Sequence, residues 1–260
     1  MKRLILSILL LASQASAQAV ISNAQLSGVS LAAPAGHTDF TASIEYCWAI
    51  VASTGGTNNC TAGSGGNGTV NGAPTYVVGP AGSHSGNRAV DMNGGSDITI
   101  ADSVFGTEAN TLTWGTWLLD EGADSKIVMH KGTVTFLETT IVATNKLRGR
   151  SSATMITPTD VMGTVWKHYA MTISGTTTRL YINGVEDCGG TCPSNGTGHA
   201  DNSVRLTLGA DSSDSGIIPG AIYESFYDNG TILTASQICS IAKWGIDGLQ
   251  DHTSLVSCTE

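Results

Sequence analysis

The 260-residue sequence has little charge and few aromatic side chains: 13% of its residues are charged and 6% are aromatic. Basic residues are the scarcest, since 12 Lys and Arg stand against 21 Asp and Glu, giving a formal net charge of −9. This acidic balance argues against nucleic acid and anionic lipid as partners, because both select basic surfaces. With 41% hydrophobic residues, the chain is nevertheless too apolar to remain disordered.

Several motifs that carry catalysis are also missing. The sequence contains no Gly-x-Ser-x-Gly, no phosphate-binding glycine loop and no His-Glu-x-x-His. Asp120 and Glu121 are adjacent, so on a strand they would point to opposite faces. These absences favour a non-catalytic protein, and a hydrolase with an unrecognised site stays as an alternative.

Long hydrophobic runs are absent beyond the N-terminus. A Lys-Arg pair at positions 2 and 3 precedes an apolar run over 4–12, and Ala15-Ser16-Ala17 supplies small residues for cleavage. This pattern predicts a signal peptide over residues 1–17, cleaved after Ala17. No later stretch approaches the roughly 20 apolar residues that a membrane span needs. We therefore expect a protein without a membrane span, exported to the extracellular space or the periplasm.

All six cysteines follow the predicted cleavage site. An even number in an oxidising compartment favours disulfides, with 15 pairings open in principle. Proximity in the sequence suggests the pairs Cys47–Cys60, Cys188–Cys192 and Cys239–Cys258. Zinc binding is the alternative, but neither Cys-x-x-Cys nor a His-x-His cluster accompanies these residues.

The 32 glycines, which show no three-residue period, instead indicate short strands joined by turns. After a leader over residues 18–41, we expect a single domain over 42–260. Apolar or alternating segments predict strands at 42–52, 75–78, 88–92, 97–101, 111–119, 127–129, 134–137, 166–173, 178–182, 204–208 and 221–227. The segment 53–72 is predicted to be a long surface loop. This spacing is typical of an all-β antiparallel sandwich.

Local signals predict how some of these elements connect. The Asn93-Gly94-Gly95 turn favours a hairpin between 88–92 and 97–101, and Gly175 favours one between 166–173 and 178–182. One short C-terminal helix is expected, with Thr234 as N-cap and Gln237 three residues later in capping-box spacing. Gly245 is expected to end this helix in a left-handed conformation.

The order of several motifs resembles the laminin G-like, or concanavalin A-like lectin/glucanase, superfamily. The motifs are Trp166-Lys167-His168-Tyr169-Ala170, then Leu180-Tyr181-Ile182-Asn183-Gly184, and Gly220-Ala221-Ile222-Tyr223-Glu224. The resemblance implies a concanavalin A-like, pentraxin-like jelly roll. Glucanases of this superfamily carry Glu-x-Asp-x-Glu or Glu-x-Asp-x-x-Glu, which is absent here. His168 is interpreted as a packed strand residue rather than a catalyst.

The resemblance also suggests a calcium site. Asp211 and Asp214 follow the predicted strand 204–208, and Asp124 precedes the strand that starts near Lys126. These positions resemble the two calcium-bearing loops of pentraxins, and calcium prefers clustered carboxylate and carbonyl oxygens. Ordinary turn residues are the alternative interpretation, because Asp favours turns by itself.

The leading hypothesis is therefore a secreted, non-catalytic, lectin-like domain that recognises a glycan or a surface protein, assisted by calcium. A structural or assembly protein, such as an adhesin subunit or a virion surface component, is the first alternative. A polysaccharide hydrolase is the second. The sequence leaves oligomerisation open.

Overall fold

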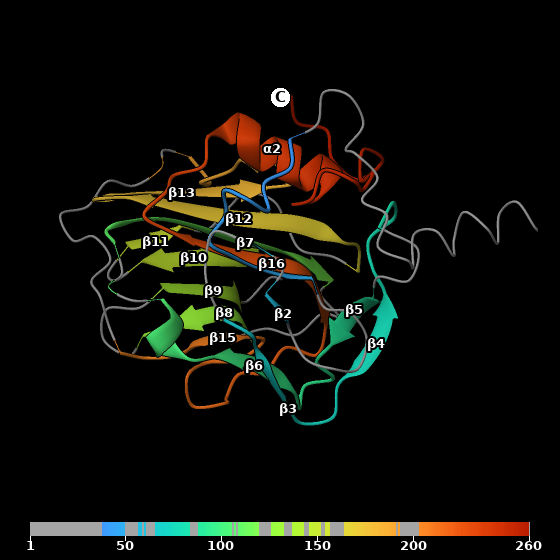
Figure 1. Ribbon diagram of the computed structural model, residues 1–260, viewed down its shortest axis with the longest axis vertical. Helices are drawn as coiled ribbons and strands as arrows, with labels where there is room; N and C mark the ends of the chain where they lie inside the picture. Colours follow the sequence, from blue (N-terminus) through green and yellow to red (C-terminus); the bar gives the residue numbers. More distant parts are fainter. Residues whose placement is uncertain are drawn as a thin grey trace, which may run out of the picture.

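The computed structural model describes residues 38–49, 57–58, 60, 66–83, 88–105, 107, 109–119, 126–132, 137–142, 146–151, 154–156, 164–190, 192 and 203–259. Within these ranges, two antiparallel sheets pack face to face, and a single α-helix lies on the outer face of one of them (Figure 1). This arrangement confirms the predicted antiparallel sandwich with a short C-terminal helix. Among the described residues, no helix is both long and apolar enough to cross a membrane. The predicted signal peptide lies outside them.

One sheet has nine strands. Seven follow the order β14-β13-β12-β7-β16-β1-β2, while β5 pairs with both β4 and β16. The strands are β1 (Tyr46–Ala49), β2 (Thr57–Asn58), β4 (Thr75–Val78), β5 (Arg88–Asp91), β7 (Thr111–Leu119), β12 (Lys167–Ser174), β13 (Thr177–Ile182), β14 (Val185–Glu186) and β16 (Ala221–Asn229).

The other sheet has seven strands in the order β11-β10-β9-β8-β15-β6-β3. They are β3 (Thr69–Asn71), β6 (Asp97–Ile100), β8 (Lys126–Lys131), β9 (Leu137–Val142), β10 (Lys146–Ser151), β11 (Thr154–Ile156) and β15 (Leu206–Leu208). A short 3-10 helix, η1 (Asp102–Val104), follows β6.

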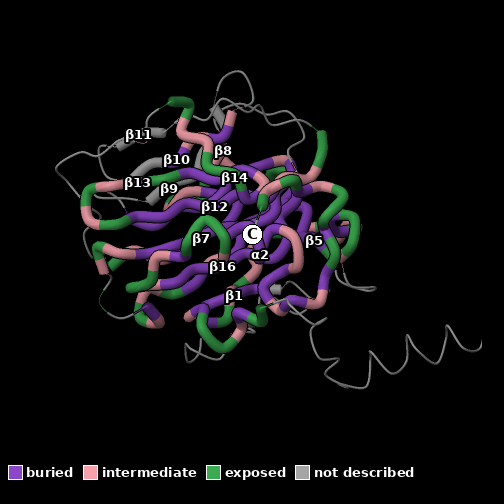
Figure 2. The backbone as a smooth tube through the Cα atoms, turned by 90° about the horizontal axis from the view of Figure 1, so that it is seen from above, coloured by how far each residue is buried: buried purple, intermediate pink, exposed green. Residues whose placement is uncertain are grey.

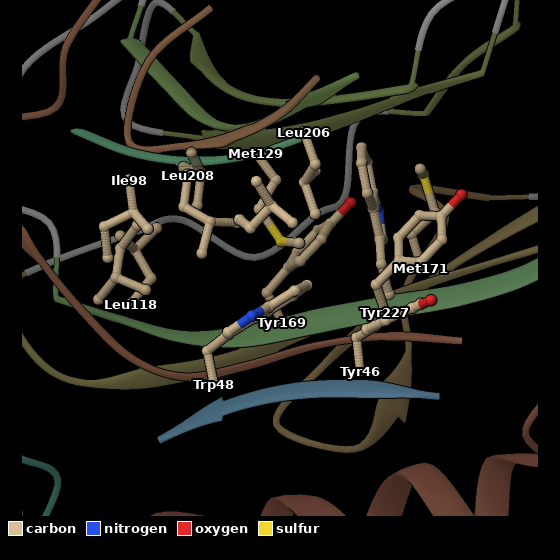
Figure 3. Packing of buried hydrophobic residues seen from close by; sticks show 14 of the residues in the cluster. Tyr46, Trp48, Ile98, Leu118, Met129, Tyr169, Met171, Leu206, Leu208 and Tyr227 are labelled. Atoms are coloured by element: carbon tan, nitrogen blue, oxygen red, sulfur yellow. The ribbon is translucent and has the colours of Figure 1, made fainter. Parts of the chain in front are cut away.

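The main core lies between the two sheets (Figure 3). Trp48 and Tyr227 come from the nine-stranded sheet, and Met129 and Leu208 come from the other, and all four are fully buried. Trp48 still satisfies its polar atom, because its Nε1 donates to the carbonyl of Gly66 at 2.6 Å. Burial of one such side chain stabilises a fold by about 1.5–3 kcal/mol. This layer therefore holds the two sheets together.

Helix α2 (Ala235–Trp244) begins at the predicted capping box. The Thr234 hydroxyl accepts from the Gln237 N–H at 3.2 Å, and the Gln237 side chain accepts from the Thr234 N–H at 2.8 Å. The helix ends at Gly245, whose φ of +74° is positive as expected. Its ψ of 173° is extended, however, so the predicted left-handed helical conformation is wrong.

The helix buries a second apolar layer on the outer face of the nine-stranded sheet. Ile238 and Ile241 belong to the same buried cluster as Tyr181 and Phe226 of the sheet. Seen from this side, the strands beneath α2 are buried, whereas exposed residues lie mainly in the surrounding turns (Figure 2). This outer face is thus largely occupied by the protein's own chain.

The three disulfides join the pairs that sequence proximity suggests. Cα atoms lie 5.3 Å apart in Cys47–Cys60, 5.0 Å in Cys188–Cys192 and 5.9 Å in Cys239–Cys258. The last of these links α2 to the C-terminal segment 246–259, which packs beside the helix. No described cysteine is free.

One predicted hairpin is confirmed and one is wrong. Strands β12 and β13 pair across Gly175, with Tyr169 opposite Ile182. Strands β5 and β6 do not pair with each other, because β5 belongs to the nine-stranded sheet and β6 to the seven-stranded one. Val90 and Ile98 both belong to the core between the sheets, and the turn between β5 and β6 connects the two sheets.

Candidate functional site

The loop over residues 209–220 follows β15 and contains two of the three predicted calcium ligands. Asp211 organises this loop, since its Oδ1 accepts from the N–H groups of Ser213 and Ser215, both at 2.8 Å. The Asp211 N–H in turn donates to the Ser215 carbonyl at 2.9 Å. Asp residues commonly stabilise turns in this way. One oxygen of the Asp211 carboxylate is therefore held by backbone donors of its own loop.

Asp214 lies in the same loop with a φ of +59° and forms an ion pair with Arg205. Arg205 directly precedes β15, and its Nη2 also donates to the Ser212 carbonyl at 3.1 Å. The Arg205 and Asp214 side chains remain 35% and 51% exposed. An ion pair with this exposure contributes only about 0–1 kcal/mol to stability. It can therefore be exchanged for contacts to a ligand at little cost.

Asp97, the first residue of β6, lies beside this ion pair. Burial is the main cause that raises the pKa of Asp97, and the nearby Asp214 raises it further, whereas Asn71 and Arg205 lower it. Asn71 Nδ2 donates to Asp97 Oδ2 at 2.9 Å and to Thr99 Oγ1 at 3.3 Å.

We call Asn71, Asp97, Thr99, Arg205 and Asp214 the β6-edge cluster. It spans β3, β6, the residue before β15 and the loop after β15, and these three strands are neighbours in the seven-stranded sheet (Figure 1). Ile98 alternates with Asp97 and Thr99 along β6 and belongs to the core, so the cluster lies on the opposite, outer face of the sheet. Helix α2 covers the other sheet, and among the described residues no α-helix lies on this face.

The structure places the start of β8 next to the 209–220 loop. The Ile127 N–H donates to the Gly216 carbonyl at 2.9 Å, and Ile127 forms a bridge with Ile217. Asp124 precedes this point by three residues but lies outside the described residues, as do Asp120 and Glu121. Calcium binding by Asp124, Asp211 and Asp214 therefore stays a prediction.

The sequence does not single out Asp97 or Arg205 as site residues. Asp97 is one of several Asp residues next to Gly and Ser, and its partner Asn71 belongs to a segment expected to be a loop. One signal in the sequence could have indicated the site. Arg205 precedes the three-residue strand β15 and the Asp211–Asp214 turn follows it, so opposite charges lie on the two sides of this strand.

A buried polar network lies under the C-terminal segment. Glu224 sits in a bulge of β16, where the register with β7 shifts, and its φ is +50°. Its Oε1 accepts from the Ile246 N–H at 3.0 Å and from Gln250 Nε2 at 2.7 Å. Burial raises the pKa of Glu224 to about 8, and Asp247 adds to the rise. The carboxyl group therefore holds a proton at neutral pH.

His168 lies close to this network and is 1% exposed. Its ring lies 5.5 Å from that of Trp117 between centroids, and Trp117 lies 4.7 Å from His252. Neither ring nitrogen of His168 has a hydrogen-bond partner among the described residues. Burial, followed by the charge of His252, lowers the pKa of His168 to about 3. These features agree with its interpretation as a packed residue.

A pair of carboxyl groups lies across β1 and β16. Because Tyr46 pairs with Tyr227, the preceding Glu45 is the neighbour of Asp228. Burial raises the pKa of Asp228 to about 7, with a further contribution from Glu45. A carboxyl group that titrates near neutrality suits general acid–base chemistry. Sequence reasoning missed this pair because the two residues lie near opposite ends of the chain.

The solved structures that resemble this fold include the following three. Domain 4 of AbnA, a GH43 extracellular arabinanase from Geobacillus stearothermophilus in complex with arabinotriose, matches with a TM-score of 0.57 and 18% identity. The match covers 77% of this chain and 98% of that domain. Trypanosoma rangeli sialidase in complex with the inhibitor DANA matches with a TM-score of 0.57 and 12% identity, over 88% of this chain but 38% of the sialidase.

The binding domain of Paraclostridial Mosquitocidal Protein 1 matches with a TM-score of 0.56 and 13% identity, over 77% of this chain and 52% of that one. At these identities the likeness concerns the fold alone. No curated protein sequence matches the chain. A family model described as the concanavalin A-like lectin/glucanases superfamily matches residues 91–239, which contain most strands of both sheets and the first half of α2. The chain therefore belongs to the concanavalin A-like lectin/glucanases superfamily.

Proposed function

We propose that this protein is a glycan-binding module and that the β6-edge cluster contacts the sugar. The observation that carries the proposal is the accessible Arg205–Asp214 pair next to Asp97 and Asn71, on the sheet face opposite to the core, where the described part of the chain has no α-helix. Guanidinium, carboxylate and amide groups together offer the donors and acceptors that sugar hydroxyls need. Asn71, Asp97 and Thr99 lie on strands, which hold side chains more precisely than loops do.

The structural neighbours support this proposal. The domain 4 structure of the arabinanase contains arabinotriose, and nearly all of that domain matches this chain. The mosquitocidal protein contributes a domain whose name states a binding role. A fold shared with carbohydrate-binding domains does not define a ligand by itself, so the residues of the β6-edge cluster provide the specific test.

Calcium assistance is a separate part of the proposal. The start of β8 lies beside the 209–220 loop. Asp124 precedes β8 by two residues in the sequence, so we propose it as a calcium ligand together with Asp211 and Asp214. A bound calcium ion would compete with Arg205 for Asp214 and would draw on the second Asp211 oxygen. Calorimetry with calcium after EDTA treatment tests this: a binding heat and a rise in melting temperature support the ion, and the absence of both contradicts it.

The central test is glycan binding by the purified chain and two matched variants. Arg205→Gln removes the guanidinium of the β6-edge cluster. Arg179→Gln removes one from another exposed ion pair, Arg179–Glu186, at 47% and 39% exposure. After a glycan array identifies a binder, with arabino-oligosaccharides included, calorimetry should show binding weakened about tenfold or more by Arg205→Gln, which corresponds to the loss of one charged hydrogen bond. Arg179→Gln should bind like the wild type.

Equal affinity in both variants would contradict the proposed site. Absence of saturable binding to any glycan, combined with oligomers in light scattering, would instead favour the structural or assembly role. A surface protein is the other ligand that we propose for this site. Pull-down experiments with intact and deglycosylated surface preparations distinguish binding to a protein from binding to its glycans.

One observation favours a second candidate, a polysaccharide hydrolase. The Glu45–Asp228 pair places together two carboxyl groups whose pKa values are both raised, mainly by burial. Reducing-sugar release from polysaccharides that is abolished by Asp228→Asn and by Glu45→Gln would support it. Turnover that survives both substitutions would contradict the pair as a catalytic site.

We also propose that residues 1–17 direct export and that 42–260 form a single exported domain. The three disulfides support an oxidising destination. Mass spectrometry of the mature N-terminus tests the cleavage site directly: a chain starting at position 18 agrees with it, and an intact Met1 contradicts it.

A further inference from the structure

A group of three potential metal ligands lies at the edge of the nine-stranded sheet, away from the β6-edge cluster. A carboxylate oxygen of Glu186 and the sulfurs of Cys188 and Cys192 all lie within 4.8 Å of one another. Glu186 ends β14, and the two cysteines follow within six residues. The sulfurs are joined in a disulfide, so they do not bind a metal in this state.

The Glu186 carboxylate is already oriented toward these sulfurs. Its Oε2 accepts from Arg179 Nη1 at 2.7 Å, while its Oε1 lies 3.3 Å from the Cys192 sulfur. One oxygen is thus held by a cation and the other faces the disulfide. Metal-binding carboxylates are commonly oriented by such a partner on their second oxygen.

The Cys188–Cys192 disulfide is the most reducible of the three on physical grounds. It closes a sequence separation of 4, compared with 13 for Cys47–Cys60 and 19 for Cys239–Cys258. Short loops gain the least chain entropy from crosslinking. Both of its cysteines are partly exposed, whereas each of the other disulfides contains at least one cysteine that is fully or almost fully buried. An attacking thiolate therefore reaches it first.

We propose that reduction of Cys188–Cys192 creates a binding site for zinc or a similar thiophilic divalent cation. A dithiol reductant attacks one sulfur, forms a mixed disulfide and then leaves as its own cyclic disulfide, so that two protein thiols form and the dithiol is oxidised. Metal binding then releases the two thiol protons. The ligands are the two thiolates and Glu186 Oε1, and a water completes a tetrahedral arrangement.

Spacing and charge both suit this site. The Cys-x-x-x-Cys spacing lies within the range found in zinc sites, and a Cα separation of 5.0 Å leaves the two thiolates free to approach one ion. Two thiolates and one carboxylate carry three negative charges. A divalent cation and Arg179 together neutralise them, so the occupied site needs no further counterion.

The first experiment maps reduction in the full-length oxidised protein. Increasing dithiothreitol, followed by iodoacetamide and peptide mapping, should label Cys188 and Cys192 at concentrations that leave the other four cysteines unlabelled. Labelling of Cys47–Cys60 or Cys239–Cys258 at the same concentration would overturn the selective opening on which the proposal depends.

The second experiment titrates the selectively reduced protein with Co²⁺ under anaerobic conditions, after removal of the reductant. We expect one Co²⁺ per chain, with thiolate charge-transfer absorption and the visible bands of a tetrahedral ion, and its displacement by Zn²⁺. The oxidised protein should show no such spectrum. A reduced protein without the charge-transfer band would overturn the site.

Substitutions distinguish the role of Glu186 as a metal ligand from that of Arg179 as a residue that positions it. Glu186→Gln should weaken Co²⁺ binding at least about tenfold and alter the visible bands, while Arg179→Gln should weaken it by about tenfold with the bands retained. Asp39→Asn, which changes an exposed carboxylate elsewhere, is the matched control and should bind normally. Unchanged affinity in Glu186→Gln would contradict the carboxylate ligand.

Discussion

Replacing Glu224 by Gln should reverse its effect on stability between acid and alkaline pH. The folded protein holds the Glu224 proton with a pKa of about 8, while the unfolded chain releases it near the ordinary value of 4.5. The resulting stability is fully present below pH 4.5 and is lost as pH rises toward 8. At about 1.4 kcal/mol per pH unit, the loss across this window is about 5 kcal/mol.

The amide introduced by Glu224→Gln would keep the acceptor for Ile246 and Gln250 but cannot titrate. Its NH₂ group would replace Oε2, which has no hydrogen-bond partner among the described residues. The protonated wild-type carboxyl group already has one unpaired O–H, so the amide adds one further unsatisfied buried N–H, which costs about 1–3 kcal/mol at every pH. Glu224→Gln should therefore be less stable than the wild type by that amount at pH 4.5. At pH 8 it should be more stable by about 2–4 kcal/mol, with the crossover near pH 6.

Urea unfolding at pH 4.5, 6 and 8, followed by tryptophan fluorescence with the disulfides intact, measures this difference. Glu186→Gln provides the matched control, because Glu186 is exposed and its replacement should leave the pH dependence of the wild type unchanged. Parallel stability curves for the wild type and Glu224→Gln across this range would refute the assignment of a buried, protonated carboxyl group.

Three further substitutions test other parts of the fold. His168 has a pKa of about 3 in the folded protein, so its contribution to the free energy of unfolding is complete above pH 6.5 and is lost as the pH falls toward 3. Relative to the wild type, His168→Phe should therefore become more stable by about 2 kcal/mol when the pH is lowered from 7 to 5, as measured by urea midpoints. Thr234→Ala should lower the unfolding free energy by about 1 kcal/mol through loss of the helix cap, and an unchanged midpoint would argue against the cap. Gly115→Ala should destabilise the fold by about 1–3 kcal/mol or more, because its Cβ would lie 2.6 Å from the Phe226 ring and 2.7 Å from the Tyr169 carbonyl; a melting temperature equal to that of the wild type would contradict this close packing.

Elements with strong local patterns could be predicted from the sequence. The β12–β13 hairpin has alternating residues around a glycine turn, and α2 has its capping box at Thr234 and Gln237, so both signals act over a few residues. Strands β10 and β11 were not predicted. The β10 sequence Lys146–Ser151 is mostly polar, with Leu147 as its only large apolar side chain, so it lacks the periodicity that marks a strand.

The error at β5 and β6 has a physical cause. A turn such as Asn93-Gly94, with φ values of +51° and +65°, permits a reversal of the chain but does not determine which strands pair. The Met92 N–H donates to Gly220 and the Gly94 N–H donates to Ile218, both at 3.0 Å. These contacts with a distant segment direct the two strands into different sheets.

In the candidate site, too, some residues could be predicted from the sequence and others could not. Asp211 and Asp214 are visible in the sequence because they share one turn, whereas Asp97 and Arg205 join them only through the sheet order β3-β6-β15. Glu45 and Asp228 likewise become neighbours through the pairing of β1 with β16. The sequence next to these residues does not indicate the contacts, because strand pairing depends on the whole set of core contacts.

The sequence by itself determined the sandwich class, the cysteine pairs close in the chain and the capped helix, since each depends on period-two alternation, short loops or backbone hydrogen bonds within a few residues. Only the tertiary structure decided which polar groups meet and which become buried. The pKa of Glu224 and the orientation of Glu186 toward a disulfide are examples. Desolvation and charge proximity arise from packing between distant segments, so they exist only once the sheets, the helix and the C-terminal segment have assembled.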